Sequence, residues 1–187
     1  MPRAPLAHEG STVPLVSVVI PAYNAEPYLA TTLRSILDQT FGDFEVIVAE
    51  NGSTDATQDV LLEFAERDER VRPLLLGANV GRSAARNAGL DVARGTWVCP
   101  MDADDLWFRG RLRELVAASR RYPAVDAFTD DLIEFTPQPD GSVALAGFYD
   151  DVEPLSDAEK QALAAVPNLE AELKKELGLG RSEGAGR

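Results

Sequence analysis

The chain has 187 residues, of which 45% are hydrophobic, and its formal net charge is −13. This length fits one domain of ordinary size with a short appendage, and the apolar fraction is sufficient for a buried core. The negative charge excludes the electrostatic footprint of a nucleic-acid-binding protein and predicts repulsion from an anionic membrane surface. A phosphate-bearing ligand must therefore be held locally, by a metal ion or by a few placed arginines.

Cysteine content and apolar patterning bear on the cellular location. The single cysteine, Cys99, excludes an internal disulfide and a cysteine-based metal site, which suits a reducing compartment. No apolar run approaches the roughly 20 residues needed to cross a bilayer, and the start of the chain lacks the order of a signal peptide. We therefore expect a soluble cytoplasmic protein in which residues 1–14 form a disordered leader.

Predicted strands and helices alternate in the first part of the chain. The run LVSVVIP at 15–21 is continuous, apolar and β-branched, which is typical of a strand buried on both faces. Residues 26–40 have a helical apolar period, and Pro27 suits the first turn of that helix. The pattern then repeats with a strand at 44–50 and a helix at 57–68.

A third unit and a fourth strand follow, with a strand at 71–77, a helix at 83–95 and a strand at 96–101. Pro73 predicts an edge or irregular position for the third strand, because proline cannot donate a ladder hydrogen bond. Strands that alternate with helices at this spacing predict an α/β fold with a doubly wound, mostly parallel sheet. Ligands of such sheets bind beyond the carboxyl ends of the strands.

The character of the sequence changes near residue 122, after a helix predicted at 109–123. Between Arg121 and Lys160 there are ten carboxylates and no Lys or Arg. The turn signal PQPDGS separates two short apolar runs and predicts an acidic hairpin. We therefore expect one α/β domain over residues 15–150 and a helical tail over 151–187.

Three carboxylates stand just beyond the fourth predicted strand, in the stretch VCPMDADDLW. Asp102 and Asp104 form an Asp-x-Asp pair, and Asp105 follows directly. Carboxylates at a strand end can hold Mg²⁺ or Mn²⁺, and a cation so held typically bridges a pyrophosphate. The alternative is a solvated turn whose acids cap the next helix, and the spacing alone does not decide between the two.

Polar or glycine-rich segments follow the other three strands as well: PAYN, ENGSTD and GANVGRSAARNAG. Together with GTWVCPMDADDLW, they resemble the inverting family 2 glycosyltransferases of the GT-A (Rossmann-like) fold, which use nucleotide-sugar donors. The resemblance covers residues 16–122 and rests on four motifs in the same order with matching gaps. It implies transfer of a sugar from a nucleoside diphosphate to an acceptor hydroxyl, with Mg²⁺ or Mn²⁺ on the leaving diphosphate.

The resemblance also implies how the nucleoside is held. Pro21 and Tyr23 correspond to the loop that packs against it, with the Tyr23 ring stacking on or edging the base. A core aromatic is the alternative for Tyr23. Glu50 and Asn51 stand where the family usually carries two acids, and the Asn51 amide offers a donor and an acceptor to a pyrimidine. Glu50 is alternatively only a strand-end acid.

The remaining implied roles concern the diphosphate and the cation. Arg82 and Arg86 lie four residues apart and are expected to approach the diphosphate, although an exposed helical arginine is an equal alternative for Arg82. Asp104 is the expected direct metal ligand, and Asp102 is expected to contact the ribose or the metal. Asp105 is expected to cap the next helix.

No catalytic base is assigned. In the family this carboxylate lies in the second half of the protein, and the late acidic motif that carries it has no counterpart here. A non-catalytic or truncated nucleotide-sugar-binding module is therefore the alternative to an active transferase. The expected donor is a UDP- or dTDP-sugar, and the acceptor is a carbohydrate or a lipid-linked sugar. Peripheral membrane association through the tail helix is less favoured than packing of that helix on its own domain or a solvated helix.

Overall fold

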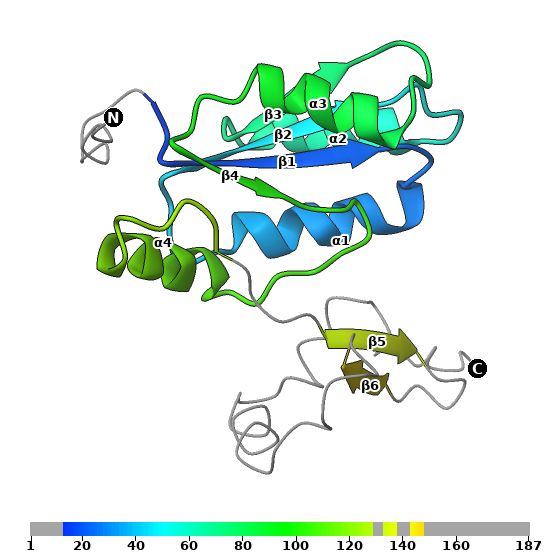
Figure 1. Ribbon diagram of the computed structural model, residues 1–187. Helices are drawn as coiled ribbons and strands as arrows, with labels where there is room; N and C mark the ends of the chain where they lie inside the picture. The colour runs from blue at the N-terminus through cyan, green and yellow to red at the C-terminus, as the bar shows by residue number, and fades with distance from the viewer. Residues whose placement is uncertain (1–12, 129–132, 138–142, 148–187) are drawn as a thin grey trace. The chain divides into compact units, whose positions relative to one another are not determined.

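The computed structural model describes residues 13–128, 133–137 and 143–147 (Figure 1). The chain divides into two units, Met1–Ala124 and Val125–Arg187. The tail helix predicted over 151–187, and all but the last two residues of the leader predicted over 1–14, lie outside the described residues. Within the described ranges, no helix combines the length and the apolar character that crossing a membrane requires.

A four-stranded parallel sheet forms the centre of the first unit. Its strands are β1 (Val16–Ala22), β2 (Phe44–Glu50), β3 (Val71–Leu75) and β4 (Trp97–Pro100), in the spatial order β3-β2-β1-β4. Every residue of β1 and β2 is buried, as the continuous apolar sequence of β1 predicts for that strand. The predicted α/β fold with a parallel sheet is confirmed.

The helices cover both faces of this sheet. They are α1 (Glu26–Leu37), α2 (Thr57–Arg67), α3 (Arg82–Asp91) and α4 (Arg111–Arg121). Helices α1 and α2 pack on each other, whereas α3 lies across β1 and β2 on the opposite face from α1 (Figure 1). The chain moves outward from β1 to β3 and then returns past β1 to β4, so right-handed crossovers place α3 on the second face. The sheet is therefore doubly wound, and the direction in which successive strands are added reverses between β1 and β4.

Pro73 occupies the position that its chemistry allows. Arg70 and Leu76 turn their backbone groups toward β2, where Val46 N donates to Arg70 O and Leu76 N donates to Glu50 O. Alternate residues of a parallel strand face alternate neighbours, so the missing N–H of Pro73 faces away from β2. Among the described strands β3 lies at the sheet edge, as predicted.

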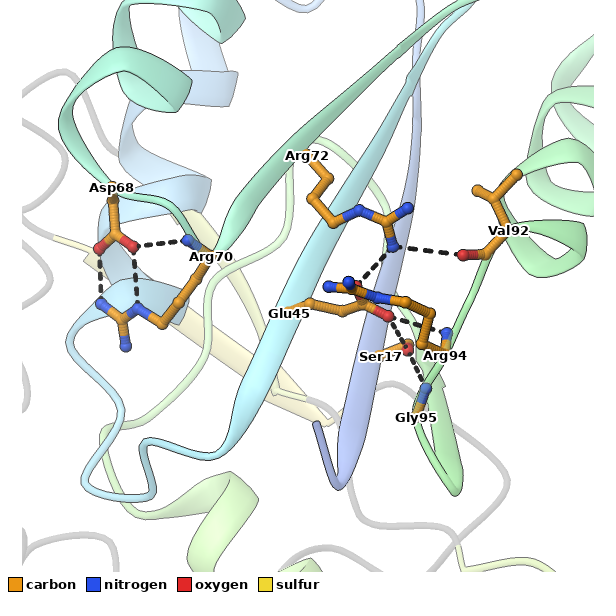
Figure 2. A network of polar contacts seen from close by, with 8 residues as sticks. All are labelled: Ser17, Glu45, Asp68, Arg70, Arg72, Val92, Arg94 and Gly95. Carbon is orange, nitrogen blue, oxygen red and sulfur yellow. Dashed lines mark hydrogen bonds and ion pairs between the residues drawn. The ribbon is translucent and has the colours of Figure 1, made fainter. Parts of the chain in front are cut away.

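A buried carboxylate joins three strands at the amino-terminal end of the sheet (Figure 2). Ser17 Oγ donates to Glu45 Oε1 over 2.7 Å, and Arg72 Nη1 lies 2.5 Å from Glu45 Oε2. Arg94 adds its backbone N–H at 2.8 Å and its side chain at 2.7 Å and 2.9 Å. Burial alone raises the pKa of Glu45, but the hydrogen bonds from Ser17, Arg94 and Arg72 outweigh it and lower the pKa to about 2. The sequence analysis did not predict this network.

Helix α3 ends earlier than its sequence pattern predicts, at Asp91 rather than residue 95. The reason is tertiary. The backbone N–H of Arg94 donates to Glu45, and that of Gly95 donates to Ser17 Oγ over 2.8 Å, so neither is available to continue the helix. A Cβ on Gly95 would lie 2.5 Å from Ser17 N, which shows how closely the chain passes β1 there.

The second unit contains an antiparallel pair of strands, β5 (Ile133–Pro137) and β6 (Val143–Gly147). Their register runs from Ile133↔Gly147 to Pro137↔Val143. These strands match the hairpin predicted from the sequence, and residues 138–142, which connect them, lie outside the described residues.

Candidate functional site

The carboxyl ends of the four parallel strands bring four loops to one edge of the sheet. The strand order reverses between β1 and β4, and in open α/β sheets ligands bind in the crevice at such a switch point. The loop after β1 carries Tyr23, and the loop after β4 carries Asp102 and Asp104. The predicted site residues are therefore grouped around the expected ligand position.

The β1 and β2 loops are fastened together by side chains. Asn24, which has a φ of 50°, accepts the Thr54 N–H on its Oδ1 over 2.9 Å, while the Asn24 N–H donates to Ser53 Oγ over 3.0 Å. The Glu26 N–H donates to Asp55 Oδ2 over 3.1 Å at the start of α1. These reciprocal bonds set the two loops as one rigid rim, because each loop satisfies the other's backbone donors.

Pro21 and Tyr23 occupy different environments. Pro21 is buried inside β1, which runs on to Ala22, so the prediction that the strand ends at residue 21 and that Pro21 lies in the loop is corrected. Proline is tolerated there because the β1–β4 ladder stops at Val19↔Pro100, before residue 21 would need a donor. Tyr23 is 46% exposed at the rim of the site, which excludes a core role for it.

Glu50 and Asn51 are both buried, and their polar atoms are engaged within the protein. Glu50 accepts the N–H groups of Gly52 and Ser53 over 3.2 Å and 2.6 Å. Asn51 Oδ1 accepts the Val80 N–H over 2.8 Å, and Asn51 Nδ2 donates to Asn79 Oδ1 over 3.1 Å. The two residues thus shape the β2 loop and attach it to the β3 loop, and base reading by Asn51 stays a prediction.

The β2 and β3 loops approach each other at Gly52. This residue has a φ of +70°, and a Cβ placed on it would lie 2.6 Å from the backbone of Ala78. Only glycine combines this conformation with this proximity at little strain. The ENGS stretch is therefore required locally for the loops to close, independently of any ligand.

Helix α3 delivers two arginines to the β4 loop. A Cβ on Gly89 would lie 2.5 Å from Val19 Cγ1, so the helix packs directly on β1. One turn earlier, Arg86 Nη2 forms an ion pair with Asp102 Oδ1, and Arg82 Nη1 lies 3.8 Å from Asp102 Oδ2. The structure thus brings together Arg82, Arg86 and Asp102, which are separated by up to 20 residues in the sequence.

The backbone that carries the Asp-x-Asp pair is fixed from two sides. The Met101 N–H donates to Val19 O over 3.0 Å and continues the contact of β4 with β1. Ala103, between the two aspartates, accepts a hydrogen bond on its carbonyl from Thr32 Oγ1 over 2.8 Å. Sequence analysis missed Thr32, although a polar residue three positions after Leu29 on the apolar stripe of α1 was the signal for it.

Asp104 and Asp105 are exposed at this turn. The pKa of Asp105 is raised, first by partial withdrawal of its carboxyl from water and then by the charges of Asp102 and Asp104. The expectation that Asp105 caps the next helix is wrong, because α4 begins at Arg111. The Leu112 N–H at that end donates instead to Gln39 Oε1 over 3.0 Å, so a side chain from beyond α1 supplies the cap.

A cation at this edge would have few protein ligands. Within the described ranges no group of three or more His, Cys, Asp or Glu residues could hold a metal ion. The carboxylate of Asp102 is engaged with arginine, whereas Asp104 has no such partner among the ion pairs of the described residues. This arrangement fits a cation held by one or two carboxylates and completed by phosphate oxygens and water, which is the usual Mg²⁺ coordination.

Comparison with known proteins places this geometry in a family. Residues 17–138 match the glycosyl transferase family 2 profile. The chain belongs to glycosyltransferase family 2. The resemblance to family 2 glycosyltransferases that the sequence motifs indicated is thereby confirmed.

Relatives of this family 2 chain carry glycosyltransferase names. It is 41% identical over 101 residues to TuaG of Bacillus subtilis (strain 168), a glycosyltransferase named for teichuronic acid biosynthesis, covering 54% of this chain and 40% of TuaG. It is 36% identical over 98 residues to WfgD of Escherichia coli, named a UDP-Glc:alpha-D-GlcNAc-diphosphoundecaprenol beta-1,3-glucosyltransferase, covering 52% and 38%. The chain therefore spans about two fifths of the length of these relatives.

Solved structures show the same fold. S. aureus TarS 1–349 in complex with UDP matches with a TM-score of 0.55 and 31% identity, over 58% of this chain and 32% of TarS. The mannosyltransferase PcManGT from Pyrobaculum calidifontis, in complex with GDP-Man and Mn²⁺, matches with a TM-score of 0.51 and 28% identity, over 65% and 35%. The family 2 chain thus has the GT-A, Rossmann-like fold that its motifs predict.

Proposed function

We propose that this chain binds a nucleotide sugar and transfers the sugar to an acceptor hydroxyl. The observation that carries the proposal is the meeting of Arg82, Arg86 and Asp102 at the switch point of the sheet, beside the exposed Asp104. In a chain of net charge −13, these arginines place cationic side chains beside the position where a diphosphate would lie. Membership of glycosyltransferase family 2 supports the same reading.

The proposed donor is a UDP- or dTDP-sugar. TarS has been solved with UDP and with UDP-GlcNAc, and the name of WfgD gives UDP-Glc as its donor. In this chain Tyr23 presents a half-exposed ring at the rim formed by the β1 and β2 loops, where it can stack on a base. The rigid rim then positions the nucleoside before the sugar is transferred.

The proposed cofactor is Mg²⁺ or Mn²⁺. Asp104 would hold the cation together with the diphosphate, with Asp102 as the neighbouring carboxylate. When bound, the cation neutralises charge that develops on the leaving diphosphate. PcManGT, which shares the fold, has been solved with Mn²⁺.

The proposed reaction is a displacement at the anomeric carbon. The acceptor oxygen forms a bond to that carbon, the bond from that carbon to the diphosphate oxygen breaks, and the electron pair leaves with the nucleoside diphosphate. The acceptor's proton must pass to a carboxylate, to which we assign no residue. The amino-terminal end of α3 contributes through Arg82, whose exposed guanidinium group can bind the diphosphate charge as it leaves.

The proposal also covers the acceptor and the cellular location of the protein. We propose a cytoplasmic protein acting on a carbohydrate or lipid-linked sugar, since WfgD is named for an acceptor that carries diphosphoundecaprenol. Peripheral membrane association of this chain is proposed only as a consequence of a lipid-linked acceptor.

A donor-binding module without turnover is the second candidate. The observation that favours it is the content of the site, where Arg82, Asp102 and Asp104 are placed for a donor and a cation while no residue is assigned as the catalytic base. In the family, the catalytic base belongs to the later part of the protein, beyond the motifs shared here. Such a module would keep the loops and arginines of the donor site and lack hydrolysis or transfer.

The deciding experiment is a calorimetric titration of UDP and dTDP into the protein with and without Mn²⁺, followed by a donor-hydrolysis assay on the same sample. Mn²⁺-dependent binding with hydrolysis of a UDP- or dTDP-sugar supports the transferase. Binding without hydrolysis supports the donor-binding module. Absence of binding to either nucleotide rejects both functions and leaves the motifs as structural elements.

A further inference from the structure

We propose that the two arginines of α3 have separate tasks: Arg82 binds the donor diphosphate, whereas Arg86 is a positioning residue that acts through Asp102. This inference rests on the proposed function, because it divides the work within the donor site. It also corrects the simpler expectation that both arginines, four residues apart on one helix, approach the diphosphate together.

The surroundings of the two guanidinium groups differ. The Arg86 side chain is 32% exposed, its Nη2 forms an ion pair with Asp102 Oδ1, and its Nε is buried without an acceptor among the described residues. The Arg82 side chain is 75% exposed and reaches Asp102 only at 3.8 Å. Arg86 is therefore partly enclosed and engaged, whereas Arg82 is extended toward solvent.

These differences determine which arginine can exchange partners. An exposed ion pair at 3.8 Å contributes little, so Arg82 can leave Asp102 for a phosphate with little loss. Arg86 makes a charge-assisted hydrogen bond in a partly desolvated setting, and such bonds are about twice as strong as neutral ones. Transfer of Arg86 to the diphosphate would also leave the Asp102 carboxylate without its nearest compensating charge.

The Arg86–Asp102 pair connects α3 with the loop after β4, and both of these segments are positioned by contacts with Val19. Gly89 packs against the Val19 side chain and sets the height of α3, while Val19 O accepts the Met101 N–H and sets the end of β4. Arg86 lies one turn from Gly89, and Asp102 follows Met101 directly. The pair therefore fixes the Asp-x-Asp backbone relative to α3. Because arginine compensates the charge of Asp102, Asp104 is the carboxylate that remains available to a cation.

A double-mutant cycle tests this division. Arg86→Gln, Asp102→Asn and the combination are titrated with UDP in the presence of Mn²⁺. If Arg86 acts through Asp102, the combined variant binds no more weakly than Asp102→Asn alone, which we expect to lose about tenfold in affinity. Arg86→Lys, which keeps the charge facing Asp102, recovers most of the affinity lost in Arg86→Gln, as a positioning role requires.

For Arg82 we expect the same cycle to give independent effects on UDP affinity. Arg82→Gln contributes its own loss, so its combination with Asp102→Asn binds more weakly than either single variant, by about the product of their effects. The matched control is Arg113→Gln on α4, where an exposed arginine pairs with Glu114 and UDP affinity stays at the wild-type level. Thermal unfolding of each variant verifies the fold, and if Arg86→Gln does not fold, the neutral variant Arg86→Met takes its place in the cycle.

The outcomes separate the two proposals. If Arg86→Gln and Asp102→Asn weaken UDP binding independently, with effects that multiply, Arg86 contacts the donor itself and this inference is overturned while the proposed function stands. If the wild-type protein does not bind UDP in the presence of Mn²⁺, the proposed function is rejected, and this inference is rejected with it.

Discussion

At the scale of single residues, the two aspartates of the Asp-x-Asp pair have different surroundings. The carboxylate of Asp102 faces Arg86 and Arg82, whereas Asp104, which follows Ala103, is exposed. Ala103 is held to α1 by Thr32, so the two side chains cannot exchange roles without moving this anchored backbone. A difference of this kind arises from the partners of each residue and not from its type.

Asp104→Asn is predicted to lower UDP affinity in the presence of Mn²⁺ by at least about tenfold, to the level measured without Mn²⁺, because the amide removes the charge that holds the cation. Stability should change by less than about 0.5 kcal/mol, since the side chain is exposed. Calorimetry and urea unfolding measure the two effects. Asp59→Asn, an exposed acid in the first turn of α2, is the control, and unchanged Mn²⁺-dependent binding by Asp104→Asn would reject the metal assignment.

At the scale of elements, the site depends on the position of α3 relative to the sheet. This helix reaches β1 at Gly89, and it carries both arginines in its amino-terminal half. The loop before α3 is attached to the β2 loop through Asn51, whose amide bonds to Asn79 and Val80. A shift of α3 would therefore move the arginines and the β3 loop together.

Gly89→Ala is predicted to destabilise the fold by about 1–3 kcal/mol, because the new methyl group meets Val19 Cγ1 at 2.5 Å and overpacks a buried contact. The better helix propensity of alanine offsets up to about 1 kcal/mol of this. UDP affinity should fall as well, since α3 is displaced from Asp102. Gly42→Ala, where a Cβ meets no atom within 4 Å, is the matched control in urea unfolding and calorimetry. Equal stability of the two variants would show that α3 is free to adjust.

At the scale of the whole molecule, charge is distributed unevenly over a strongly acidic chain. Arginines gather at two places on the sheet: around Asp102 at the carboxyl edge, and around Glu45 at the amino edge (Figure 2). The first group belongs to the candidate site. The second group joins β1, β2 and β3 to the segment after α3, so it stabilises the sheet that both edges share.

The Glu45 network predicts a dependence of stability on pH. The folded pKa of about 2 lies below the ordinary value of 4.5, so the contribution of Glu45 is present above pH 4.5 and is lost as the pH falls toward 2. A shift of this size corresponds to about 3 kcal/mol. In urea unfolding, Glu45→Gln should be less stable than wild type at pH 7, and the difference should shrink at pH 3.

The control for this prediction is Glu63→Gln, which removes an exposed ion pair with Arg67 on α2. It should change stability by less than about 1 kcal/mol and keep the wild-type pH dependence. The lowered pKa values of Asp55 and Asp68 leave some acid sensitivity in every variant. A difference between wild type and Glu45→Gln that stays constant from pH 7 to pH 3 would contradict the assignment.

The sequence by itself determined the order of elements, the parallel sheet and the edge at which the site lies. Continuous β-branched runs, apolar helical periods and Pro73 are local signals, because each reflects the burial or hydrogen bonding of the residue that carries it. The grouping of four polar loops then follows from topology, since parallel strands end at a common edge.

Only the tertiary structure decided which partner each polar residue takes. Gln39 caps a helix 73 residues further along the chain, Thr32 bonds to Ala103 across 71 residues, and Ser17 bonds to Glu45 across 28. A sequence pattern records that a side chain is polar but not which distant group satisfies it, because that choice is made when elements pack. The proposed difference in role between Arg86 and Arg82 has the same origin, since the two arginines share a helix and differ in which groups lie opposite them.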